Sequence, residues 1–431
     1  MHTPCYDALV IGGGPGGSCA ANLLAQQGLK VVVFEKEVFP RFHIGESLLP
    51  YNRGIFEELG VLDALAKAGF PRKTGAQFHL GNGSAGTRFQ FRQGRFNRET
   101  EIFQVERARF DEILLRQAAK AGAEVHEGWT AGRIEADSDP ITLEVKDPAG
   151  TLHTFRGRFL VDASGRGNLS GNQQGLRIMH PRLKKLAIYA HFTGVELDPG
   201  EAGGDTVIYR LENQWFWIIP ISAEKTSVGL VTDRDAFQQS RARPEEAFQA
   251  AVRSSPDLAR RLAGARRLGE LEVTADFSYA NRTFASPRVI RVGDAAAFID
   301  PIFSSGVFLA MHSARLAAQA IVQAHRQGTD GLAQFRRYER RMRAALAQYS
   351  RMVELYYTHP FIELFLQPRG RLDIPSAVNA MLAGELQGGW KVRWRLNLFY
   401  WMVRLQRRIG FVPHLSHAPV VPQPETTPAV G

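Results

Sequence analysis

The sequence is poor in cysteine and has no long apolar run. Its 431 residues include two cysteines, Cys5 and Cys19, which form neither a CxxC pair nor a metal-ligand spacing. This scarcity excludes a disulfide framework and is typical of a reducing compartment. The N-terminus also lacks the charged and apolar regions of a secretory signal, and the longest apolar run, at 398–403, is too short to span a bilayer. We therefore expect a cytoplasmic protein with no transmembrane segment and no bound metal.

Acidic residues are outnumbered, because 53 Lys and Arg stand against 43 Asp and Glu, giving a formal net charge of +10. A basic balance can indicate nucleic-acid binding, but these residues are scattered and no recognition motif accompanies them, so we expect no such partner. The C-terminal segment 386–431 is an exception, because it contains a single acid, Glu425. Its basic residues are Lys391, Arg393, Arg395, Arg404, Arg407 and Arg408. This segment offers a positive face to an acidic partner protein or an anionic surface.

Glycine, in contrast, is concentrated in the run GGGPGG at residues 12–17. An apolar run at 6–11 predicts a buried parallel strand before it, and the Ala- and Leu-rich residues 18–27 predict a helix after it. Residues 31–34 predict a second strand, which ends at Glu35. The order strand, glycine turn, helix, strand and acid is typical of a dinucleotide-binding unit.

Each part of this turn has a physical task. Gly12 makes the tight turn, Gly14 lets the backbone approach a pyrophosphate, and Gly17 lets the helix pack closely on the strand. The pyrophosphate would lie on the amides at the helix N-terminus. Glu35, at the strand tip, would accept a hydrogen bond from a ribose hydroxyl.

The following residues extend the same domain. Residues 36–50 predict a loop, since two prolines and a glycine argue against regular structure, and a loop this long is more often functional than filler. Residues 108–121 predict an amphipathic helix, with Arg107 at its N-terminal side, where it can reach a phosphate. Strands are expected at 152–157 and at 159–162, around an antiparallel insertion.

Residues 183–275 change character, because their apolar residues alternate as in antiparallel strands. Trp215 and Trp217 stand one residue apart at the centre of this region, so they point to the same face of a strand. Taken alone, they indicate packing beneath a sheet.

The chain then returns to the first domain through a strand at 288–292, whose exit carries Asp294. A helix is expected from Val307 onward, and the amides of Ser305 and Gly306 would be free at its start. Such amides favour an anion.

With these pieces assembled, the chain resembles the flavin-dependent halogenases, which belong to the FAD-dependent aromatic monooxygenases, over residues 5–412. The glycine turn, the turn after Asp162 and the exit at Gly293 and Asp294 are shared with that whole group. They indicate FAD rather than NAD, because segments about 280 residues apart would hold the two ends of the cofactor.

Three features are narrower. Residues 215–220, WFWIIP, match the WxWxIP signature of the halogenases. Residues 298–306, FIDPIFSSG, match the segment that lies against the isoalloxazine and holds halide in that family. Lys73 falls where the family keeps its catalytic lysine, in a Lys-x-Gly context, although in isolation it would be read as an exposed lysine. Residues 44–50 resemble the flavin-covering segment.

The resemblance implies a role for each of these residues. Lys73 would be the catalytic residue. FAD would be bound by Gly12, Gly14, Gly17, Glu35, Arg41, Ser47, Arg107, Asp294, Pro301, Gly306 and Val307. Halide would lie against Ser305 and Gly306. The signature and tunnel would be formed by Trp215, Trp217, Ile219, Pro220, Phe303 and Ser304.

The resemblance also implies a reaction. FAD, supplied reduced by a separate flavin reductase, would react with oxygen to a flavin hydroperoxide, which chloride or bromide attacks. The resulting hypohalous acid would travel through the tunnel to Lys73, beside an electron-rich aromatic substrate. A lysine suits this role because its ammonium can donate to oxygen, its amine can form a haloamine, and burial lowers its pKa.

One departure from the family is informative. Halogenases of free tryptophan carry a glutamate directly before the Ser-Thr-Gly of the halide segment, whereas Phe303 precedes Ser304, Ser305 and Gly306 here. A phenylalanine can neither orient an indole nitrogen nor take a proton. The chain is therefore more similar to halogenases of phenols and pyrroles, some of which act on groups tethered to carrier proteins.

Three alternatives stay open. A single-component aromatic hydroxylase is disfavoured, because its turn normally reads Asp-Gly where this chain has Asp162-Ala163. A prenyl-chain reductase of related fold would account for the apolar C-terminal helices but not for Lys73 beside the tryptophan signature. A basic protein that binds flavin without catalysis predicts no halide-dependent product.

The predicted fold is thus α/β, with a Rossmann-like FAD-binding domain, an antiparallel-sheet substrate domain and a helical C-terminal region. The FAD-binding domain is expected at 1–182 and 276–330, and the substrate domain at 183–275. The helical region is expected at 331–412, followed by a disordered tail at 413–431.

Overall fold

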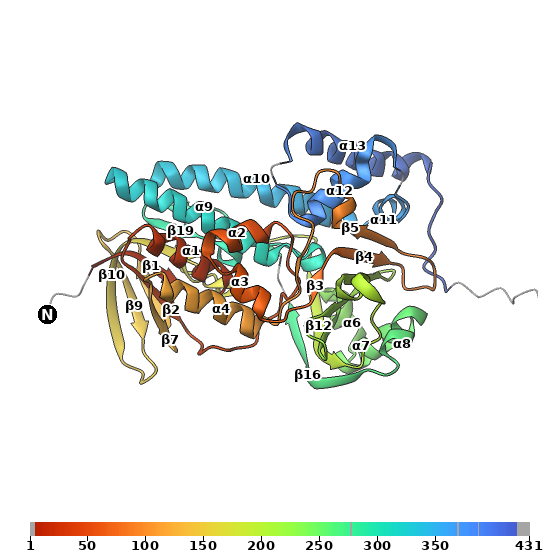
Figure 1. Cartoon of the computed structure of the whole chain (residues 1–431), viewed down its shortest axis with the longest axis horizontal. Coiled ribbons are helices and arrows are strands. Elements are labelled where there is room, and N and C mark those ends of the chain that lie inside the picture. Colours follow the sequence, from red (N-terminus) through yellow and green to blue (C-terminus); the bar gives the residue numbers. More distant parts are fainter. Residues whose placement is uncertain (1–4, 276–277, 369, 387, 420–431) are drawn as a thin grey trace, which may run out of the picture.

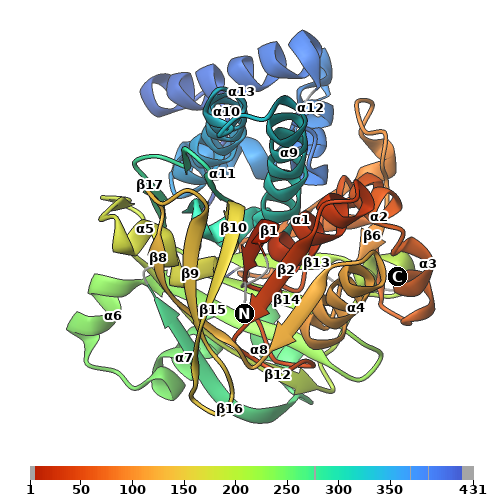
Figure 2. The same cartoon turned by 90° about the vertical axis from the view of Figure 1, so that its left-hand side faces the viewer.

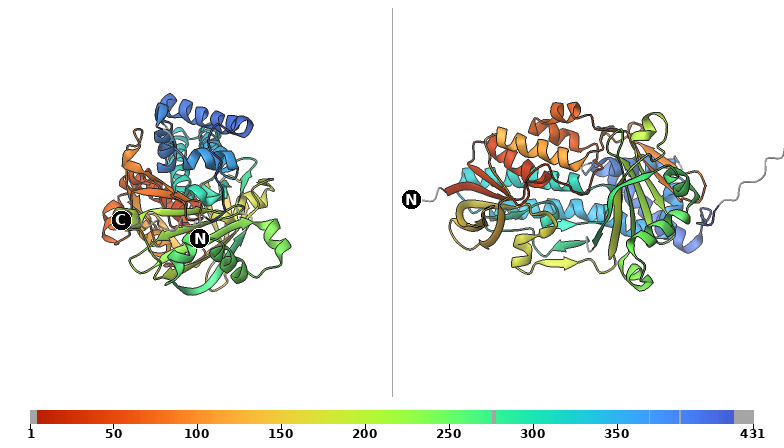
Figure 3. Two further views of the ribbon diagram at one scale, coloured as in Figure 1. Left: turned by 90° about the vertical axis from the view of Figure 1, so that its right-hand side faces the viewer. Right: turned by 90° about the horizontal axis from the view of Figure 1, so that it is seen from below.

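The computed structural model describes residues 5–275, 278–368, 370–386 and 388–419. Two large sheets follow one another along the long axis of the molecule (Figures 1 and 3). Among the described residues, no helix combines the length and the apolar character needed to cross a membrane.

The first sheet is built around β1 (Cys5–Ile11), the strand before the glycine turn. In spatial order its strands are β18 (Ala285–Ser286), β19 (Val289–Arg291), β10 (Leu152–Asp162), β1, β2 (Val31–Glu35) and β7 (Glu124–Glu127), with β9 (Ile141–Lys146) on β10 and β8 (Thr130–Glu135) on β9. β1 pairs in parallel with both β2 and β10. A strand buried between parallel neighbours needs an unbroken apolar sequence, and this explains the run before the glycines.

Strand β10 differs from its prediction. Two strands were expected, at 152–157 and 159–162, but the structure has a single strand. The first half of β10 pairs antiparallel with β9, and its second half pairs in parallel with β1 and β19. One strand therefore serves both the antiparallel insertion and the parallel sheet.

Helices from distant parts of the chain meet on this sheet. α1 (Pro15–Gln26) begins at the glycine turn and packs between α4 (Arg107–Lys120) and α9 (Gly306–Gln327) (Figure 2). The small residues of α1 allow close contact, and the Cys19 thiol lies 3.6 Å from the carbonyl oxygen of Met311 in α9. The remaining helices of this part are α2 (Asn52–Leu59), α3 (Leu62–Lys67), α5 (Leu169–Gln173) and α10 (Leu332–Tyr356).

The second sheet is larger than predicted. In spatial order it contains β16 (Arg266–Ala275), β12 (Lys185–Thr193), β15 (Thr226–Asp233), β14 (Trp215–Pro220), β13 (Thr206–Arg210), β4 (Gly75–His79) and β5 (Thr87–Gln90). β4 and β5 lie outside the boundaries expected for this domain. They join it because β4 pairs in parallel with β13, with Phe78 opposite Ile208. This long-range pairing has no local sequence signal.

The two faces of this sheet bury different residues. Phe216 and Ile218 of β14 lie in a core with Phe248, under α7 (Pro244–Arg253) and α8 (Pro256–Leu262). Trp215 and Trp217 point the other way and belong to the core that the sheet shares with the first domain. The alternation along β14 therefore directs both tryptophans toward the interface between the two sheets.

The C-terminal helices α11 (His359–Leu366), α12 (Ile374–Ala383) and α13 (Gly389–Ile409) lie over β5 (Figure 1). The Asn379 amide donates to the carbonyl oxygen of Gln90 at 2.8 Å. Of the predicted tail, residues 413–419 are described, and the carbonyl oxygen of Ser416 accepts from the Asn82 amide at 2.8 Å. Residues 420–431 lie outside the described residues. The shorter elements are β3 (Arg72–Lys73), β6 (Ile102–Phe103), β11 (Arg177–Met179), β17 (Tyr279–Asn281), β20 (Ala297–Phe298) and α6 (Arg234–Ser240).

Candidate active site

The glycine turn joins β1 to α1 in a conformation that only glycine fits. Gly12 has a φ of +96°, and a Cβ there would lie 2.4 Å from the carbonyl oxygen of Ala163. A Cβ at Gly17 would lie 1.8 Å from the carbonyl oxygen of Gly12. At Gly14, in contrast, the nearest atom to a Cβ would be Nη2 of Arg41, at 3.6 Å. The first two glycines serve packing, while the backbone at Gly14 borders open space.

Glu35 lies at the tip of β2, where the sequence predicts it. Its side chain is 5% exposed and accepts from the amides of Gly13 at 2.6 Å and Glu37 at 3.0 Å. Because a carboxylate has about four acceptor positions, these two bonds leave Glu35 able to accept a further donor beside the turn.

Arg107 is the first residue of α4, and hydrogen bonds on two sides hold its side chain in place. Its guanidinium donates to both carboxylate oxygens of Asp111, at 2.7 and 2.8 Å, and to the carbonyl oxygen of Ile44 at 2.8 Å. Arg41 donates to the same Asp111 at 2.7 Å. Although burial opposes it, the Arg107 charge holds the pKa of Asp111 below its usual value. Sequence reasoning missed Asp111, whose only signal was its spacing of four residues from Arg107 on the predicted helix.

Residues 44–50, which we call the covering loop, contain a carboxylate that is only half satisfied. Glu46 is 2% exposed, and its Oε1 lies 2.6 Å from Nε2 of His191 in β12. Its Oε2 is buried without a hydrogen-bond partner among the described residues. A buried acceptor without a donor is costly, so Oε2 indicates a position for a donor from a bound molecule.

The start of α9 lies beside the glycine turn at the start of α1. A Cβ at Gly16 in α1 would lie 3.6 Å from the carbonyl oxygen of Ala310 in α9, so the starts of the two helices are neighbours. Burial raises the pKa of Asp294 to about 6, against the opposing charges of Arg166 and Arg107. Gly306, the first residue of α9, is exposed, and a Cβ there would meet no atom within 4 Å.

The segment 298–306, which the resemblance assigns to halide, ends in a defined turn. Pro301 begins a short 3-10 turn at 301–303, and Ser304 follows with a φ of +55°. Ser305 occupies the N-cap position of α9, without a side-chain cap hydrogen bond, and is 4% exposed. Val307 lies buried in the first turn of that helix.

Lys73 is buried rather than exposed. Its side chain is 1% exposed, and Nζ donates to Ser47 Oγ at 2.8 Å and to the carbonyl oxygen of Leu48 at 2.9 Å. Nζ also lies 5.8 Å from the centre of the Phe91 ring. Burial lowers the pKa of Lys73 to about 7, against the opposing charge of Asp205. At neutral pH the side chain is thus divided between ammonium and neutral amine.

A polar network ties the lysine to the second sheet. Ser47 Oγ lies 2.7 Å from Thr206 Oγ1 in β13, to which the Gln104 amide also donates at 3.0 Å. The same amide donates to the carbonyl oxygen of Gly204 at 3.1 Å. Lys73 therefore lies between the covering loop and the start of β13.

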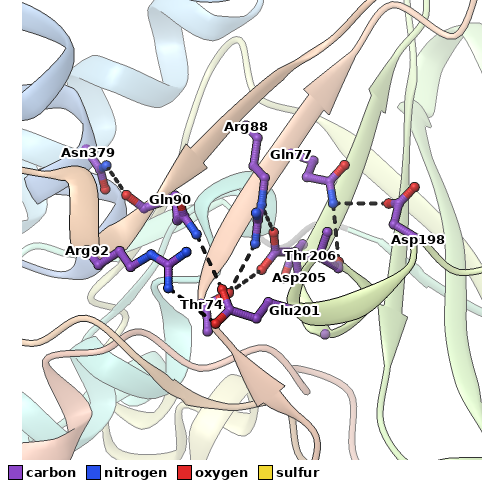
Figure 4. Close-up of polar contacts among 12 residues, drawn as sticks. Thr74, Gln77, Arg88, Gln90, Arg92, Asp198, Glu201, Asp205, Thr206 and Asn379 are labelled. Atoms are coloured by element: carbon purple, nitrogen blue, oxygen red, sulfur yellow. Dashed lines mark hydrogen bonds and ion pairs between the residues drawn. The ribbon is translucent and has the colours of Figure 1, made fainter.

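Asp205, the carboxylate whose charge acts on the pKa of Lys73, belongs to a second polar cluster (Figure 4). Asp205 has no exposed surface and accepts from Arg88 Nε at 2.6 Å and from Thr74 Oγ1 at 3.3 Å. Glu201, in the turn before it, lies 3.3 Å from Arg92. Sequence reasoning missed these contacts, because only the tertiary fold brings Thr74 and residues 88–92 next to residues 201–205.

The tryptophan signature lies buried along β14, where Ile219 and Pro220 complete it. The rings of Trp215 and Trp217 have centres 5.9 Å apart. Trp217 donates to Ser227 at 3.0 Å and lies against Gly229 of β15, where a Cβ would be 2.2 Å from the indole ring. The absence of a side chain at position 229 therefore makes room for the tryptophan, a requirement that the sequence did not reveal.

Phe303 is buried, with its ring centre 6.5 Å from that of Phe78 in β4. No group of three or more His, Cys, Asp or Glu side chains in the described part of the chain could hold a metal ion.

The predicted site residues thus form two groups that one loop connects. Arg107 beside the glycine turn holds the carbonyl of Ile44, and Lys73 holds Ser47 and the carbonyl of Leu48. The open backbone at Gly14 and Gly306 and the unpaired Glu46 oxygen fit a bound dinucleotide of the FAD type.

Comparisons with known proteins agree with this geometry. The family described as FAD binding domain matches residues 5–351. The 1H-pyrrole-2-carbonyl-(peptidyl-carrier protein) chlorinase of Pseudomonas fluorescens is 34% identical over 409 residues, which are 89% of this chain and 90% of the relative. The tryptophan 2-halogenase of Chondromyces crocatus is 39% identical over 73% of this chain, which spans 60% of that longer protein.

Solved structures give the same result. The flavin-dependent brominase Bmp2 has a TM-score of 0.84 and 30% sequence identity, with 94% of this chain and 100% of that chain covered. The predicted α/β fold with a FAD-binding domain and a helical C-terminal region is confirmed. The second sheet, which was expected to be antiparallel, is mixed because β4 pairs in parallel with β13. The chain belongs to the flavin-dependent halogenases of the FAD-binding monooxygenase family, and it is a flavin-dependent halogenase enzyme.

Proposed function

We propose that this halogenase chlorinates or brominates a phenol or a pyrrole, using FAD reduced by a separate flavin reductase, and that Lys73 carries the halogen to the ring. The observation that supports this most directly is the burial of Lys73, with a pKa lowered to about 7. A surface lysine would remain charged and could not act as a nucleophile at neutral pH.

The hydrogen bonds of Lys73 suit a nucleophilic amine. A neutral amine has two N–H donors and one lone pair, and Nζ donates to two acceptors, Ser47 Oγ and the Leu48 carbonyl. The lone pair is then left to attack hypohalous acid, forming an N–halogen bond and releasing water. Transfer of the halogen to the aromatic ring would return the amine, with the ring proton replacing the halogen on nitrogen.

The halide would bind at the start of α9. This helix has 22 residues, and Ser305 and Gly306 stand at its N-terminus, where the helix dipole and free amides favour an anion. Bound reduced FAD would supply the oxygen activation that oxidises the halide. Glu35, Asp294 and the glycine turn would hold its ribose and ribityl hydroxyls and its pyrophosphate.

Phe303 supports a phenol or pyrrole rather than free tryptophan. It is buried against Phe78, so this position offers neither a proton acceptor nor a hydrogen bond to an indole nitrogen. The pyrrole-carrier chlorinase matches the chain over most of both lengths, and that similarity favours a carrier-bound pyrrole among the candidates.

Helix α13 would offer a basic face to a carrier protein. Arg404, Arg407 and Arg408 are exposed there, next to Trp401, which is 55% exposed. An acidic carrier protein would be attracted to such a face, and an aromatic side chain among the charges adds contact area.

The function is tested by mass spectrometry of a substrate panel with reduced FAD, oxygen and either chloride or bromide. The panel contains phenols, free and carrier-bound pyrroles, and free tryptophan. We expect chlorine or bromine isotope doublets in a phenol or pyrrole product. Efficient chlorination of free tryptophan would contradict the substrate class, and the absence of any halogenated product would contradict the reaction.

Gly14→Val is expected to prevent FAD binding. The side chain would occupy the open space at the turn, where the pyrophosphate must approach. The Kd for FAD, measured by flavin fluorescence, should rise at least ~10-fold, equal to about 1.4 kcal/mol. Gly54→Val in α2, where a Cβ meets no atom within 4 Å, is the control. A Gly14→Val protein that purifies with full flavin content would show that the cofactor lies elsewhere.

Lys73→Ala should abolish the halogenated product and leave FAD binding intact. Lys73→Arg should not restore it, because a guanidinium stays protonated. Product is measured by the isotope doublets, and bound FAD by absorbance. Lys67→Ala, at an exposed position of α3, is the matched control and should retain activity. Unchanged halogenation by Lys73→Ala would exclude this mechanism even if the fold and the cofactor are as described.

Charge reversal on α13 tests the carrier. The triple variant Arg404→Glu, Arg407→Glu and Arg408→Glu should raise the KM for a carrier-bound substrate about 10-fold, because electrostatic attraction accelerates encounter by this order or more. The KM for a free substrate should not change. Reversal of the exposed Arg336, Arg337 and Arg340 on α10 provides a control of equal charge. If both triple variants behave alike, α13 is not the docking face.

A further inference from the structure

A buried chain of hydrogen bonds joins the halide segment to the tryptophan signature. Asp300, directly before Pro301, has no exposed surface. One of its carboxylate oxygens accepts from the amide of Ile302 at 3.1 Å, and the other accepts from the Tyr357 hydroxyl at 2.7 Å. The Tyr357 oxygen in turn accepts from the indole nitrogen of Trp215 at 2.9 Å.

The direction of each hydrogen bond in this chain is determined by chemistry. An indole N–H can only donate, so the Tyr357 oxygen must accept from Trp215. The single hydroxyl proton of Tyr357 is then available to one acceptor, which is Asp300. Each group thus satisfies the next, and removal of the central Tyr357 hydroxyl leaves both the Trp215 indole N–H and one Asp300 oxygen without this partner.

The three residues belong to three separate parts of the molecule. Trp215 lies in the central strand β14, Tyr357 follows the end of α10, and Asp300 precedes the first turn of the halide segment. The segment has little freedom beyond this point, because the amide of Ser304 donates to the carbonyl oxygen of Pro301 at 2.9 Å and the carbonyl oxygen of Ser305 accepts from the amide of Leu309 in α9 at 2.8 Å. A displacement at Asp300 must therefore be passed on to Ser305 and Gly306.

Two cationic side chains lie near the Tyr357 ring of this hydrogen-bond chain. Nζ of Lys185 lies 4.2 Å from the centre of the Tyr357 ring, and the guanidinium carbon of Arg210 lies 5.8 Å from it. Burial raises the pKa of Asp300 to about 6, against the opposing effects of the Tyr357 hydroxyl, the Ile302 amide and Lys185. At neutral pH the carboxylate is therefore mostly ionised and able to accept from both donors.

We infer that Asp300 and Tyr357 are positioning residues, which hold the turn at 301–306 in register with the tryptophan strand and so determine the geometry of the halide site. This inference rests on the proposed binding of halide at Ser305 and Gly306. Neither residue touches the reacting atoms, and both act through the backbone that carries the halide amides.

Tyr357→Phe is the sharpest test, because it keeps the ring beside Lys185 and Arg210 and removes only the hydroxyl. Tyr356→Phe is a matched control, since the neighbouring hydroxyl is buried without a hydrogen-bond partner among the described residues. The measurements are the KM for bromide, and the Kd for bromide from quenching of the fluorescence of enzyme-bound oxidised FAD. The KM for the aromatic substrate and the Kd for FAD are measured in parallel.

We expect Tyr357→Phe to raise the bromide KM and Kd about 10-fold, as for the loss of a buried hydrogen bond of about 1.4 kcal/mol. The constants for FAD and the aromatic substrate should stay near wild type, and Tyr356→Phe should be unchanged in all four. A merely structural role would lower the Tm without this selective loss of halide affinity. Bromide constants for Tyr357→Phe equal to those of Tyr356→Phe would overturn the inference.

If Tyr357→Phe does not fold, Asp300→Asn takes its place, since it preserves shape while removing the charge that Tyr357 and Ile302 satisfy. The same bromide constants decide the outcome in the same way. Failure of the proposed function is distinguishable, because wild-type enzyme would then give no halogenated product and no bromide-dependent quenching. A wild-type protein with both signals and an Asp300→Asn protein with wild-type bromide constants would reject the positioning role alone.

Discussion

The hydrogen bonds between Lys73 and the covering loop are the interaction that fixes the position of the amine on which the proposed halogen transfer depends. Removing an amine from water costs several kcal/mol unless its hydrogens find acceptors. Here the acceptors are Ser47 Oγ and the Leu48 carbonyl, so the loop cannot move without exposing or unsatisfying the lysine. Arg107 fastens the same loop at Ile44. The cofactor side and the lysine side are therefore held in one geometry by seven residues of chain.

The second sheet completes this arrangement from the other side. Thr206 of β13 bonds to Ser47, and Asp205 before it supplies the negative charge that acts on Lys73. β13 is held in place by its parallel pairing with β4, which begins two residues after Lys73. The lysine and the acid that influences its pKa thus lie just before the paired strands β4 and β13, although they are 132 residues apart in the chain.

Local patterns explain which parts of the molecule could be predicted from sequence. The glycine turn, its flanking strands and α4 follow from short-range periodicity and from glycine chemistry, and the WxWxIP run is read directly. The burial of Lys73 follows only from the family resemblance and not from the local pattern, because Pro71 and Gly75 beside it suggest an exposed turn. Asp111, Gly229 and Tyr357 escaped for a related reason, since each acts on a partner that only the tertiary fold brings near. Membership of β4 in the second sheet likewise depends on a distant strand.

In the proposed reaction, the halide and the lysine have opposite electrostatic requirements. The start of α9 offers a fixed positive potential to an anion, whereas a permanently charged Lys73 would compete for the same halide. A pKa lowered to about 7 weakens that competition, and the donors of Lys73 are already directed to Ser47 and Leu48. The buried rings of Trp215 and Trp217 stand on the face of β14 that meets the first domain, where in the proposed reaction they would limit contact between substrate and cofactor. Burial of this lysine therefore has two effects in the proposed reaction. It weakens the attraction of Lys73 for the halide, which leaves the anion to the start of α9, and it prepares the amine for halogen transfer.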